Sequence, residues 1–341
     1  MTPDLIIVGA GSAGCVLAER LSRDSARKVL LIEAGPPDTQ IFIRMPAGVA
    51  KAIGSKRFNW HYWTTPQTHM NIRRLTTPRG KTLGGAAAIN AMVYIRGNAW
   101  DYDNWAAQGC TGWSYEDVLP YFREVEGNAH GDGPFHGGGG PLKVSHPESG
   151  NPAYLAFIDA GVEMGFAANP DLNGQAQDGF GPFQLNIHGG RRWSAADAFL
   201  KPALSRPNLS VKTDAQVIGL EMAGERVTGV RLAGQTVNAA DVVLSAGSIG
   251  TPQIMMLPGL GPADHLASLG ITPAVDIPGL GDNLQDHLEV KVKHRMTEPY
   301  SMWSHAKFPN YLWTGLRYLL TGQGAGRQQG LEAGAFLTLD P

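Results

Sequence analysis

The sequence predicts an α/β fold with a Rossmann-like first domain, and the pattern of its first 33 residues supports this class. Residues 5–8 form an apolar run that fits a buried strand. Residues 12–23 are compatible with a helix, and residues 29–32 form a second apolar run. A glycine-rich turn joins the first strand to the helix. This order is typical of the βαβ unit of a parallel sheet.

Three glycines in the turn have separate physical roles. Gly9 allows the tight turn, Gly11 lets the backbone approach a pyrophosphate, and Gly14 permits close packing of the helix on the strand. The helix N-terminus offers N–H groups and a positive dipole end to the phosphates. Glu33, 19 residues after Gly14, can accept hydrogen bonds from ribose hydroxyls and would repel the 2′-phosphate of NADP. The alternative is a glycine-rich turn without a ligand, and the strand, spacing and acid together argue against it.

Residues 36–78 are irregular and rich in aromatic side chains. Phe58, Trp60, Tyr62 and Trp63 favour a satellite core beneath extended loops, and the lining of a ligand channel is the alternative.

Two further glycine-rich segments follow. Gly84 and Gly85 open a run of small residues that lets backbone approach a bulky ligand. Residues 131–141 predict a turn-rich or flexible loop, suited to a lid or hinge.

The later part of the chain contains one more helix, a hairpin and a strand–helix junction. Residues 151–165 have helical periodicity. Residues 241–247 predict a buried strand that ends in small residues, and Pro252 suits the first turn of a helix over 251–257. Short strands, with a turn at 223–226, are predicted at residues 208–213, 217–222 and 227–232.

The number of glycine-lined segments favours FAD as the ligand. One G-x-G-x-x-G turn cannot distinguish NAD from FAD, but the three glycine-lined approaches, at residues 9–14, 84–85 and 246–247, indicate a large, extended cofactor. From the residues alone, a small NAD-dependent dehydrogenase stays an alternative.

Composition and charge argue against several classes of protein. The 341 residues suffice for about two domains. A net charge of −2 removes the usual argument for binding nucleic acid or anionic membranes, and no apolar run approaches the ~20 residues of a membrane span. Cys15 and Cys110 suggest neither a disulfide framework nor a metal site. Without a secretory leader pattern, we expect a cytoplasmic location.

Four sequence blocks resemble the glucose–methanol–choline (GMC) family of FAD-dependent oxidoreductases, in particular its choline dehydrogenase-like branch. The first block is the N-terminal turn with Glu33, and the other three are more specific to the family. The blocks after the first are residues 80–97, 245–254 and 278–287. The resemblance extends from residue 4 to residue 336.

The resemblance implies FAD contacts in each of the glycine-rich segments. The cofactor-binding residues that it implies are Gly9, Gly11, Ser12, Ala13, Gly14, Glu33, Ala34, Leu83, Gly84, Asn90, Met92, Val93, Val217, Ala246 and Gly247. Some relatives attach FAD to a histidine where this chain has Ile89, so we expect non-covalent binding. Ala86 and Ala87 stand where the family has serines, which removes a hydroxyl contact to the cofactor.

The resemblance also implies the division into domains. We expect an FAD-binding domain with a mixed sheet over residues 1–285, with an excursion into the substrate domain near 151–195. Residues 286–341 would begin an α+β substrate domain. Family members continue beyond the position of Pro341, and that section holds their catalytic histidine. We therefore assign no catalytic base in this chain.

Glu332 is the one residue for which the resemblance implies a place on the substrate side. Its carboxylate could attract a cationic alcohol such as choline, but a sheet-edge or surface acid is the interpretation that we favour. Residues 311–320 predict a helix in the substrate-domain core, and membrane anchoring is the less favoured alternative. No metal motif occurs. The histidines interpreted as ordinary turn or loop residues are His61, His69, His130, His136, His188 and His287.

These predictions leave two functions open besides the NAD-dependent one. The first is FAD-dependent oxidation of a primary alcohol to an aldehyde, with this chain supplying the FAD-binding part and the electron acceptor unknown. The second is a flavin-binding module without activity. Open sheet edges would favour aggregation, association with a complementary C-terminal chain, or a homo-oligomer.

Overall fold

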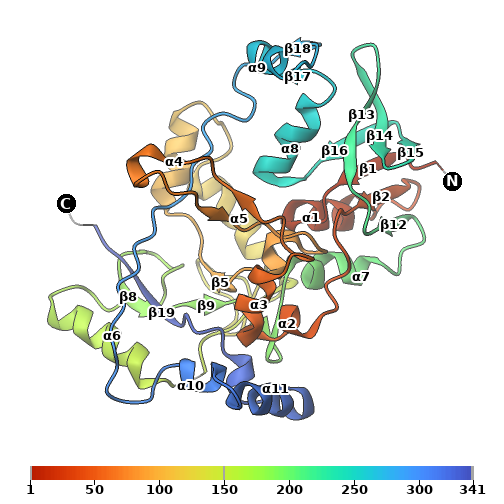
Figure 1. Cartoon of the computed structure of the whole chain (residues 1–341). Helices are drawn as coiled ribbons and strands as arrows, with labels where there is room; N and C mark the ends of the chain where they lie inside the picture. Colours follow the sequence, from red (N-terminus) through yellow and green to blue (C-terminus); the bar gives the residue numbers. More distant parts are fainter. Residues whose placement is uncertain (1, 149, 339–341) are drawn as a thin grey trace. The chain divides into compact units, whose positions relative to one another are not determined.

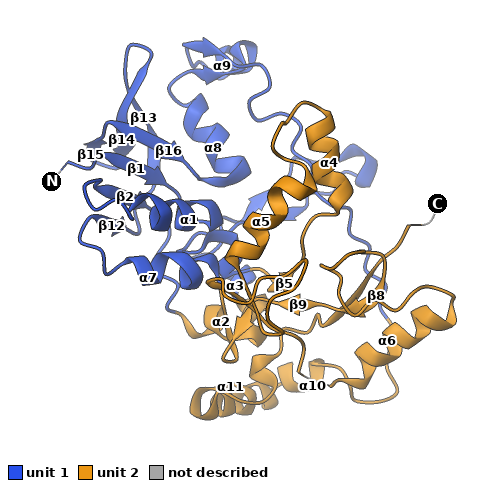
Figure 2. Cartoon of the chain, turned by 180° about the vertical axis from the view of Figure 1, so that it is seen from behind, with its two compact units in different colours: residues 1–39, 52–89, 194–293 blue, residues 40–51, 90–193, 294–341 orange. Residues whose placement is uncertain are grey.

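A computed structural model of the chain describes residues 2–148 and 150–338. The chain forms two compact units, each assembled from three segments (Figure 2). Unit 1 consists of residues 1–39, 52–89 and 194–293, and unit 2 of residues 40–51, 90–193 and 294–341. The predicted domains, residues 1–285 for the cofactor and residues 286–341 for the substrate, are divided by function. This division stays a prediction.

The elements of unit 1 are short strands and helices, and Figure 1 labels many of them. They are β1 (Leu5–Val8), α1 (Ser12–Leu21), β2 (Val29–Ile32), β3 (Tyr62–Trp63), η2 (Thr68–Met70), β4 (Thr76–Thr77), η3 (Gly85–Ala88), η4 (Ala196–Leu200), α7 (Lys201–Ala203), β12 (Leu209–Lys212), β13 (Val217–Ala223), β14 (Arg226–Leu232), β15 (Gln235–Asn238), β16 (Asp241–Leu244), α8 (Gly247–Met256), β17 (Leu260–Gly261), α9 (Ala263–Ser268) and β18 (Val275–Asp276). Helix α3 (Val49–Gly54) contains the junction of segments 40–51 and 52–89.

A four-stranded parallel sheet in the order β12-β2-β1-β16 is the centre of unit 1. Leu5 pairs with Val29 on one side and with Asp241 on the other. All four residues of β1 are buried because strands flank it on both sides. The predicted α/β, Rossmann-like class is confirmed, and the antiparallel strands of this unit form a separate sheet, β13-β14-β15.

The main core of unit 1 combines side chains from the parallel sheet with side chains from the hairpin. Ile6 and Val230 are fully buried, and Val217 and Ile254 belong to the same cluster. The predicted hairpin turn is present, with Gly224 at a φ of +62°.

Two predictions for the strand–helix junction need correction. Strand β16 is only partly buried, with Asp241 exposed, because it is the edge strand of the sheet. Helix α8 begins at Gly247, before the predicted start, and Pro252 lies inside it.

Unit 2 consists of small two-stranded sheets surrounded by helices. Its elements are α2 (Ile41–Arg44), η1 (Pro46–Gly48), β5 (Val93–Tyr94), α4 (Ala99–Ala107), α5 (Tyr115–Val125), β6 (Glu126–Asn128), β7 (Leu142–Val144), α6 (Pro152–Glu163), β8 (Gly179–Pro182), β9 (Gln184–Leu185), β10 (Ile187–His188), β11 (Arg191–Arg192), α10 (Trp303–Ala306), α11 (Asn310–Thr321), η5 (Ala325–Arg327) and β19 (Ala333–Phe336).

The predicted helices of unit 2 are present, but one is less buried than expected. Helix α6 corresponds to the periodic segment 151–165. Helix α11 covers the predicted segment 311–320, yet only Tyr318 is buried, while Trp313 and Leu320 are exposed. The expectation that α11 belongs to a core was therefore wrong. No helix within residues 2–148 and 150–338 is both long and apolar enough to span a membrane.

Candidate functional site

A cavity of about 630 Å³ opens at the ends of the parallel strands of unit 1. Nine of the predicted cofactor residues line it, and they come from the first turn, the end of β2, β13 and the β16–α8 junction. These nine are Gly9, Gly11, Ser12, Ala13, Glu33, Ala34, Val217, Ala246 and Gly247. Ligands of open α/β sheets bind in this position, outside the carboxyl ends of the strands.

The glycines of the first turn show the geometry expected for their roles. Gly9 has a φ of +97°, and a Cβ there would lie 2.6 Å from the carbonyl oxygen of Ser245. At Gly14 a Cβ would lie 1.9 Å from the carbonyl oxygen of Gly9, so helix α1 packs on the turn without room for a side chain. No atom lies within 4 Å of a Cβ at Gly11. Gly11 is the N-cap residue of α1, and no side chain caps the helix there. The turn therefore presents bare backbone and a helix N-terminus to the cavity.

Glu33 is buried at the end of β2. Its carboxylate accepts hydrogen bonds from the backbone N–H groups of Ala10 and Gly35, at 2.8 and 2.9 Å. Burial raises the pKa of Glu33 from 4.5 to about 7, although the two N–H donors and the charge of Lys81 oppose the shift. The pKa of Glu33 is higher in the folded chain than in the unfolded chain, so the folded chain binds this proton more tightly. The stability that results is complete below about pH 4.5 and is lost as pH rises to about 7.

The second glycine segment forms the adjoining wall. Gly85 has a φ of +55°, and a Cβ there would lie 2.7 Å from Cα of Gly11. The N–H of Gly84 donates to the carbonyl oxygen of Ala10 at 2.8 Å. Gly85 and Ala86 line the cavity, whereas Gly14, Leu83 and Gly84 are not part of its lining and support the backbone behind it.

Three predicted cofactor residues, Asn90, Met92 and Val93, belong to unit 2 and do not line this cavity. The Asn90 side chain accepts hydrogen bonds from the N–H of Met92 at 3.0 Å and from Arg192 at 2.7 Å. Met92 is 1% exposed and packs with Leu185 in a small core. Their contact with a cofactor stays a prediction.

Two aromatic residues also line the unit 1 cavity. Trp60 and Tyr62 stack with their rings 5.8 Å apart, and the Lys81 ammonium lies 4.5 Å from the Trp60 ring. Their place in the lining agrees with the channel alternative, while Phe58, at 2% exposure, is part of a core. His61 between them has a φ of +54°. Sequence reasoning left both possibilities open because aromatic residues suit either environment.

Unit 2 contains a second cavity, of about 430 Å³. Glu332 lines it and is 5% exposed, so it is not a surface acid; the sheet-edge interpretation stays open, because Glu332 directly precedes β19 in a two-stranded sheet. Arg327 and Glu148, which also line it, form an ion pair at 3.2 Å. His146 and His188 contribute imidazole rings.

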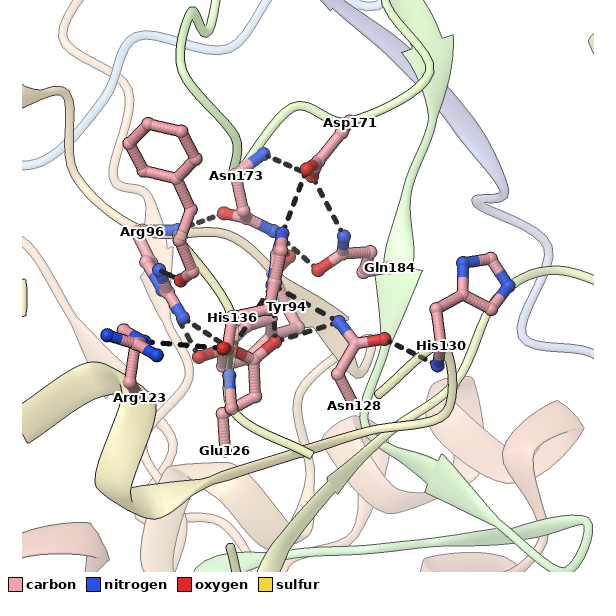
Figure 3. Close-up of polar contacts among 12 residues, drawn as sticks. Tyr94, Arg96, Arg123, Glu126, Asn128, His130, His136, Asp171, Asn173 and Gln184 are labelled. Carbon is pink, nitrogen blue, oxygen red and sulfur yellow. Dashed lines mark hydrogen bonds and ion pairs between the residues drawn. The ribbon is translucent and has the colours of Figure 1, made fainter. Parts of the chain in front are cut away.

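A buried charge cluster beside β6 is the feature that sequence reasoning missed (Figure 3). Glu126 is fully buried and pairs with Arg96 at 2.5 Å and with Nδ1 of His136 at 2.9 Å. Nε2 of His136 bonds to Asp171 at 2.8 Å. His136 therefore joins two carboxylates and is not an ordinary loop residue. The four side chains come from separate segments of the sequence, and no local motif connects them. They are Arg96, Glu126, His136 and Asp171.

The cluster also restrains the glycine-rich loop. Arg96 donates to the carbonyl oxygen of Phe135 at 2.6 Å, and the N–H of Gly137 donates to Glu126 at 3.2 Å. The N–H of Asn128 donates to the carbonyl oxygen of Gly137 at 2.9 Å. The middle of the predicted flexible loop is thus attached to a buried ion pair.

The ionisation of the cluster follows from these contacts. Hydrogen bonds to Asp171 and then to Glu126 raise the pKa of His136 from 6.5 to about 9, so the imidazole is charged at neutral pH. Burial alone would raise the pKa of Glu126, but the His136 and Asn128 hydrogen bonds and the charge of Arg96 lower it. The pKa of Asp171 is lowered in the same way, by the His136 hydrogen bond against burial.

We expect a pH dependence of stability from His136. A pKa that is higher in the folded chain gives a contribution that is complete below about pH 6.5 and lost as pH rises through about 9. Urea unfolding followed by tryptophan fluorescence across this range measures the effect. His136→Gln keeps polar contacts but cannot titrate, so its curve should be flatter. Equal slopes for both proteins would contradict this assignment.

Within the described part of the chain, no three His, Cys, Asp or Glu side chains gather as ligands for a metal ion. The thiol of Cys15 is buried, and this burial raises its pKa to about 12. It therefore remains protonated and unreactive at neutral pH.

Comparisons with known sequences agree on one family. The family profile described as GMC oxidoreductase matches residues 3–289. The oxygen-dependent choline dehydrogenase of Brucella ovis is 43% identical over 343 residues, which cover 99% of this chain and 62% of that protein. The protein of the same name from Staphylococcus saprophyticus is 44% identical, over 98% of this chain and 61% of that protein. The chain thus spans about three fifths of the length of these relatives.

Solved structures share the fold. Pyridoxine 4-oxidase from Mesorbium loti is 36% identical with a TM-score of 0.78, over 81% of this chain and 56% of that one. An FAD-dependent oxidoreductase from Chaetomium thermophilum is 29% identical with a TM-score of 0.85, over 97% and 61% of the two chains. Formate oxidase from Aspergillus oryzae is 27% identical with a TM-score of 0.85, over 97% and 61%.

Proposed function

The chain belongs to the GMC oxidoreductase family, and from this premise we propose that it binds FAD in unit 1. We propose further that it supplies the cofactor-binding part of an enzyme that oxidises a primary alcohol to an aldehyde. The observation that carries this proposal is the cavity of about 630 Å³, lined by bare backbone from three glycine-rich segments.

The residues of the cavity suit the parts of FAD. The turn at Gly9 and Gly11, with the N-terminus of α1, suits the diphosphate, because backbone N–H groups and the helix dipole favour an anion. Glu33 suits the ribose hydroxyls, since each carboxylate oxygen has a second lone pair besides the one used by the backbone. Val217 lines the cavity, and by the resemblance to the family it would pack against the adenine. Bound flavin would supply the acceptor for a hydride from the alcohol carbon.

We propose that the cofactor is held without a covalent bond. Ile89 stands where some relatives carry the linking histidine, and its aliphatic side chain is 3% exposed and cannot form such a bond. Precipitation of the reconstituted protein with acid should leave all the flavin in the supernatant.

For the substrate, we propose a cationic primary alcohol such as choline, held in the unit 2 cavity. Glu332 contributes a buried carboxylate to that cavity, and the relatives from Brucella ovis and Staphylococcus saprophyticus are named choline dehydrogenases. The same relatives are named oxygen-dependent, which suggests oxygen as the electron acceptor. No catalytic base is assigned in this sequence. A homo-oligomer or a complementary chain, and a cytoplasmic location, stay predictions.

Reconstitution of the purified chain with FAD, followed by its absorption spectrum and the addition of choline without oxygen, tests this function. We expect a yellow protein, and bleaching of its flavin band with choline would indicate turnover by this chain itself. A yellow protein that does not bleach would indicate a binding module without turnover. A colourless protein that binds NADH would contradict the proposal.

A further inference from the structure

We propose that helix α11 binds the surface of a membrane that contains anionic lipids, with its apolar side chains at the boundary between headgroups and acyl chains. Five exposed apolar side chains of the helix form this surface, which we call the α11 face. They are Leu312, Trp313, Leu316, Leu319 and Leu320. None of the five lines the cavity of unit 1 or that of unit 2, so the inference goes beyond the proposed function.

The helix is attached to unit 2 by its other side. Tyr318 is buried, and its hydroxyl donates a hydrogen bond to the carbonyl oxygen of Gly190 at 3.1 Å. At 3.6 residues per turn, Leu316 and Leu320 lie about 160° around the helix from Tyr318. Trp313 is 68% exposed and Leu320 is 75% exposed. The α11 face therefore points away from the core of its own unit.

The segment before α11 extends this apolar surface. Helix α10 precedes α11 directly and lies against it, and Figure 1 shows both in blue. Trp303 of α10 and Phe308, between the two helices, are exposed, and the Phe308 ring lies 6.3 Å from the ring of Tyr311. A single exposed apolar side chain is ordinary, but a group that continues over two helices marks an interaction surface.

Positive charge borders the α11 face. Residues 299–331 contain no Asp or Glu, although the whole chain has a net charge of −2. Lys307 and Arg317 are exposed within this segment. The ammonium of Lys51, from another segment of unit 2, lies 5.2 Å from the Tyr311 ring at the start of the helix. The charge of the whole chain therefore does not describe this surface.

These features match a membrane surface. An amphipathic helix with Leu and Trp on one face and Lys or Arg beside it lies in the plane of the bilayer interface, where Trp is enriched. Arg317 lies one turn after Trp313, so its guanidinium can reach the headgroups while the ring enters the acyl boundary. Anionic lipids place negative charge next to an apolar layer, and that arrangement complements the α11 face.

The length of the helix determines how it would bind. The 12 residues of α11 extend about 18 Å, less than the ~30 Å of a bilayer core. The helix would therefore lie on one leaflet and would not cross the membrane. Membrane anchoring, the less favoured interpretation of residues 311–320 from the sequence, gains support from the exposed face.

The test uses the full chain and vesicles of two compositions: phosphatidylcholine alone, and equimolar phosphatidylcholine and phosphatidylglycerol. We expect the chain to sediment with the mixed vesicles and much less with phosphatidylcholine alone, and we expect its affinity to fall as salt is added. Mixed vesicles with brominated acyl chains should quench the tryptophan fluorescence. Trp313→Phe keeps an apolar ring, so it should still bind but should lose part of this quenching.

Two variants test the apolar and the charged part of the surface separately. Leu320→Ser should weaken the affinity for mixed vesicles by about tenfold, because an apolar side chain no longer enters the acyl boundary. Arg317→Gln should weaken it by about fivefold and reduce its dependence on salt. Both side chains are exposed in the free chain, so the thermal unfolding of these variants should match that of the wild type.

Leu269→Ser is the matched control. Leu269 is 61% exposed at the end of α9 in unit 1, so its loss removes similar apolar surface outside the α11 face. The affinity of this variant for mixed vesicles should equal that of the wild type.

Three results would overturn the inference: no binding to mixed vesicles, equal binding to both compositions, or wild-type affinity in Leu320→Ser. If Leu320→Ser is less stable than the wild type, Arg317→Gln and its salt dependence decide. Analytical ultracentrifugation tests for a protein on the same surface. A wild-type dimer that Leu320→Ser dissociates, without binding to vesicles, would overturn the inference and assign the α11 face to a second copy of the chain.

Discussion

Gly14→Ala should destabilise unit 1 by about 3 kcal/mol or more and abolish FAD binding. The new Cβ would lie 1.9 Å from the carbonyl oxygen of Gly9, which is backbone and cannot rotate away. Helix α1 would have to move off the turn, and the cavity wall would move with it. Urea unfolding and titration of FAD by flavin fluorescence measure the two effects.

Gly11→Ala is the matched control. No atom lies within 4 Å of a Cβ at this position, so the free energy of unfolding should change by only about 0.5 kcal/mol. Because Gly11 lines the cavity, its methyl group should still weaken FAD binding. A Gly14→Ala protein with wild-type stability would show that the close packing of α1 on the turn is not required.

Glu126→Ala should destabilise unit 2 by about 3–5 kcal/mol. The change leaves the buried guanidinium of Arg96 without its carboxylate and removes one of the two carboxylate partners of His136. It also removes the acceptor for the N–H of Gly137, so the glycine-rich loop should become mobile. Urea unfolding followed by tryptophan fluorescence, with limited proteolysis at residues 131–141, measures both results.

Glu163→Ala, at the exposed C-terminal end of α6, is the comparison, and its free energy of unfolding should stay within about 0.5 kcal/mol of the wild type. If Glu126→Ala loses less than about 1 kcal/mol, the buried pair contributes far less than its geometry indicates.

The local part of the fold could be predicted from the sequence. Strand β1, helix α1 and strand β2 follow from apolar runs separated by turn residues, and each is confirmed at or near its predicted bounds. The hairpin of β13 and β14 follows from its alternation and its glycine turn. In these segments the residues that interact are also near each other in the sequence.

The remainder depends on contacts between distant segments. No local sequence pattern indicates that each unit is assembled from separate segments. The same holds for the edge position of β16 and for the exposed face of α11. His136 looks like a polar loop residue until Glu126 and Asp171 are placed beside it. The cavity residues of the first turn were predictable because a phosphate-binding turn has its own sequence pattern.

The pairing of β1 with β16 has a consequence for biosynthesis. β1 leaves the ribosome well before its neighbour at Asp241–Leu244, which follows it by more than 200 residues of the chain. Until then one edge of Leu5–Val8, all of it apolar, has no partner strand. Such late closure of a parallel sheet is slow and exposed to aggregation. The nascent polypeptide is therefore a natural client for chaperones that shield apolar segments during translation.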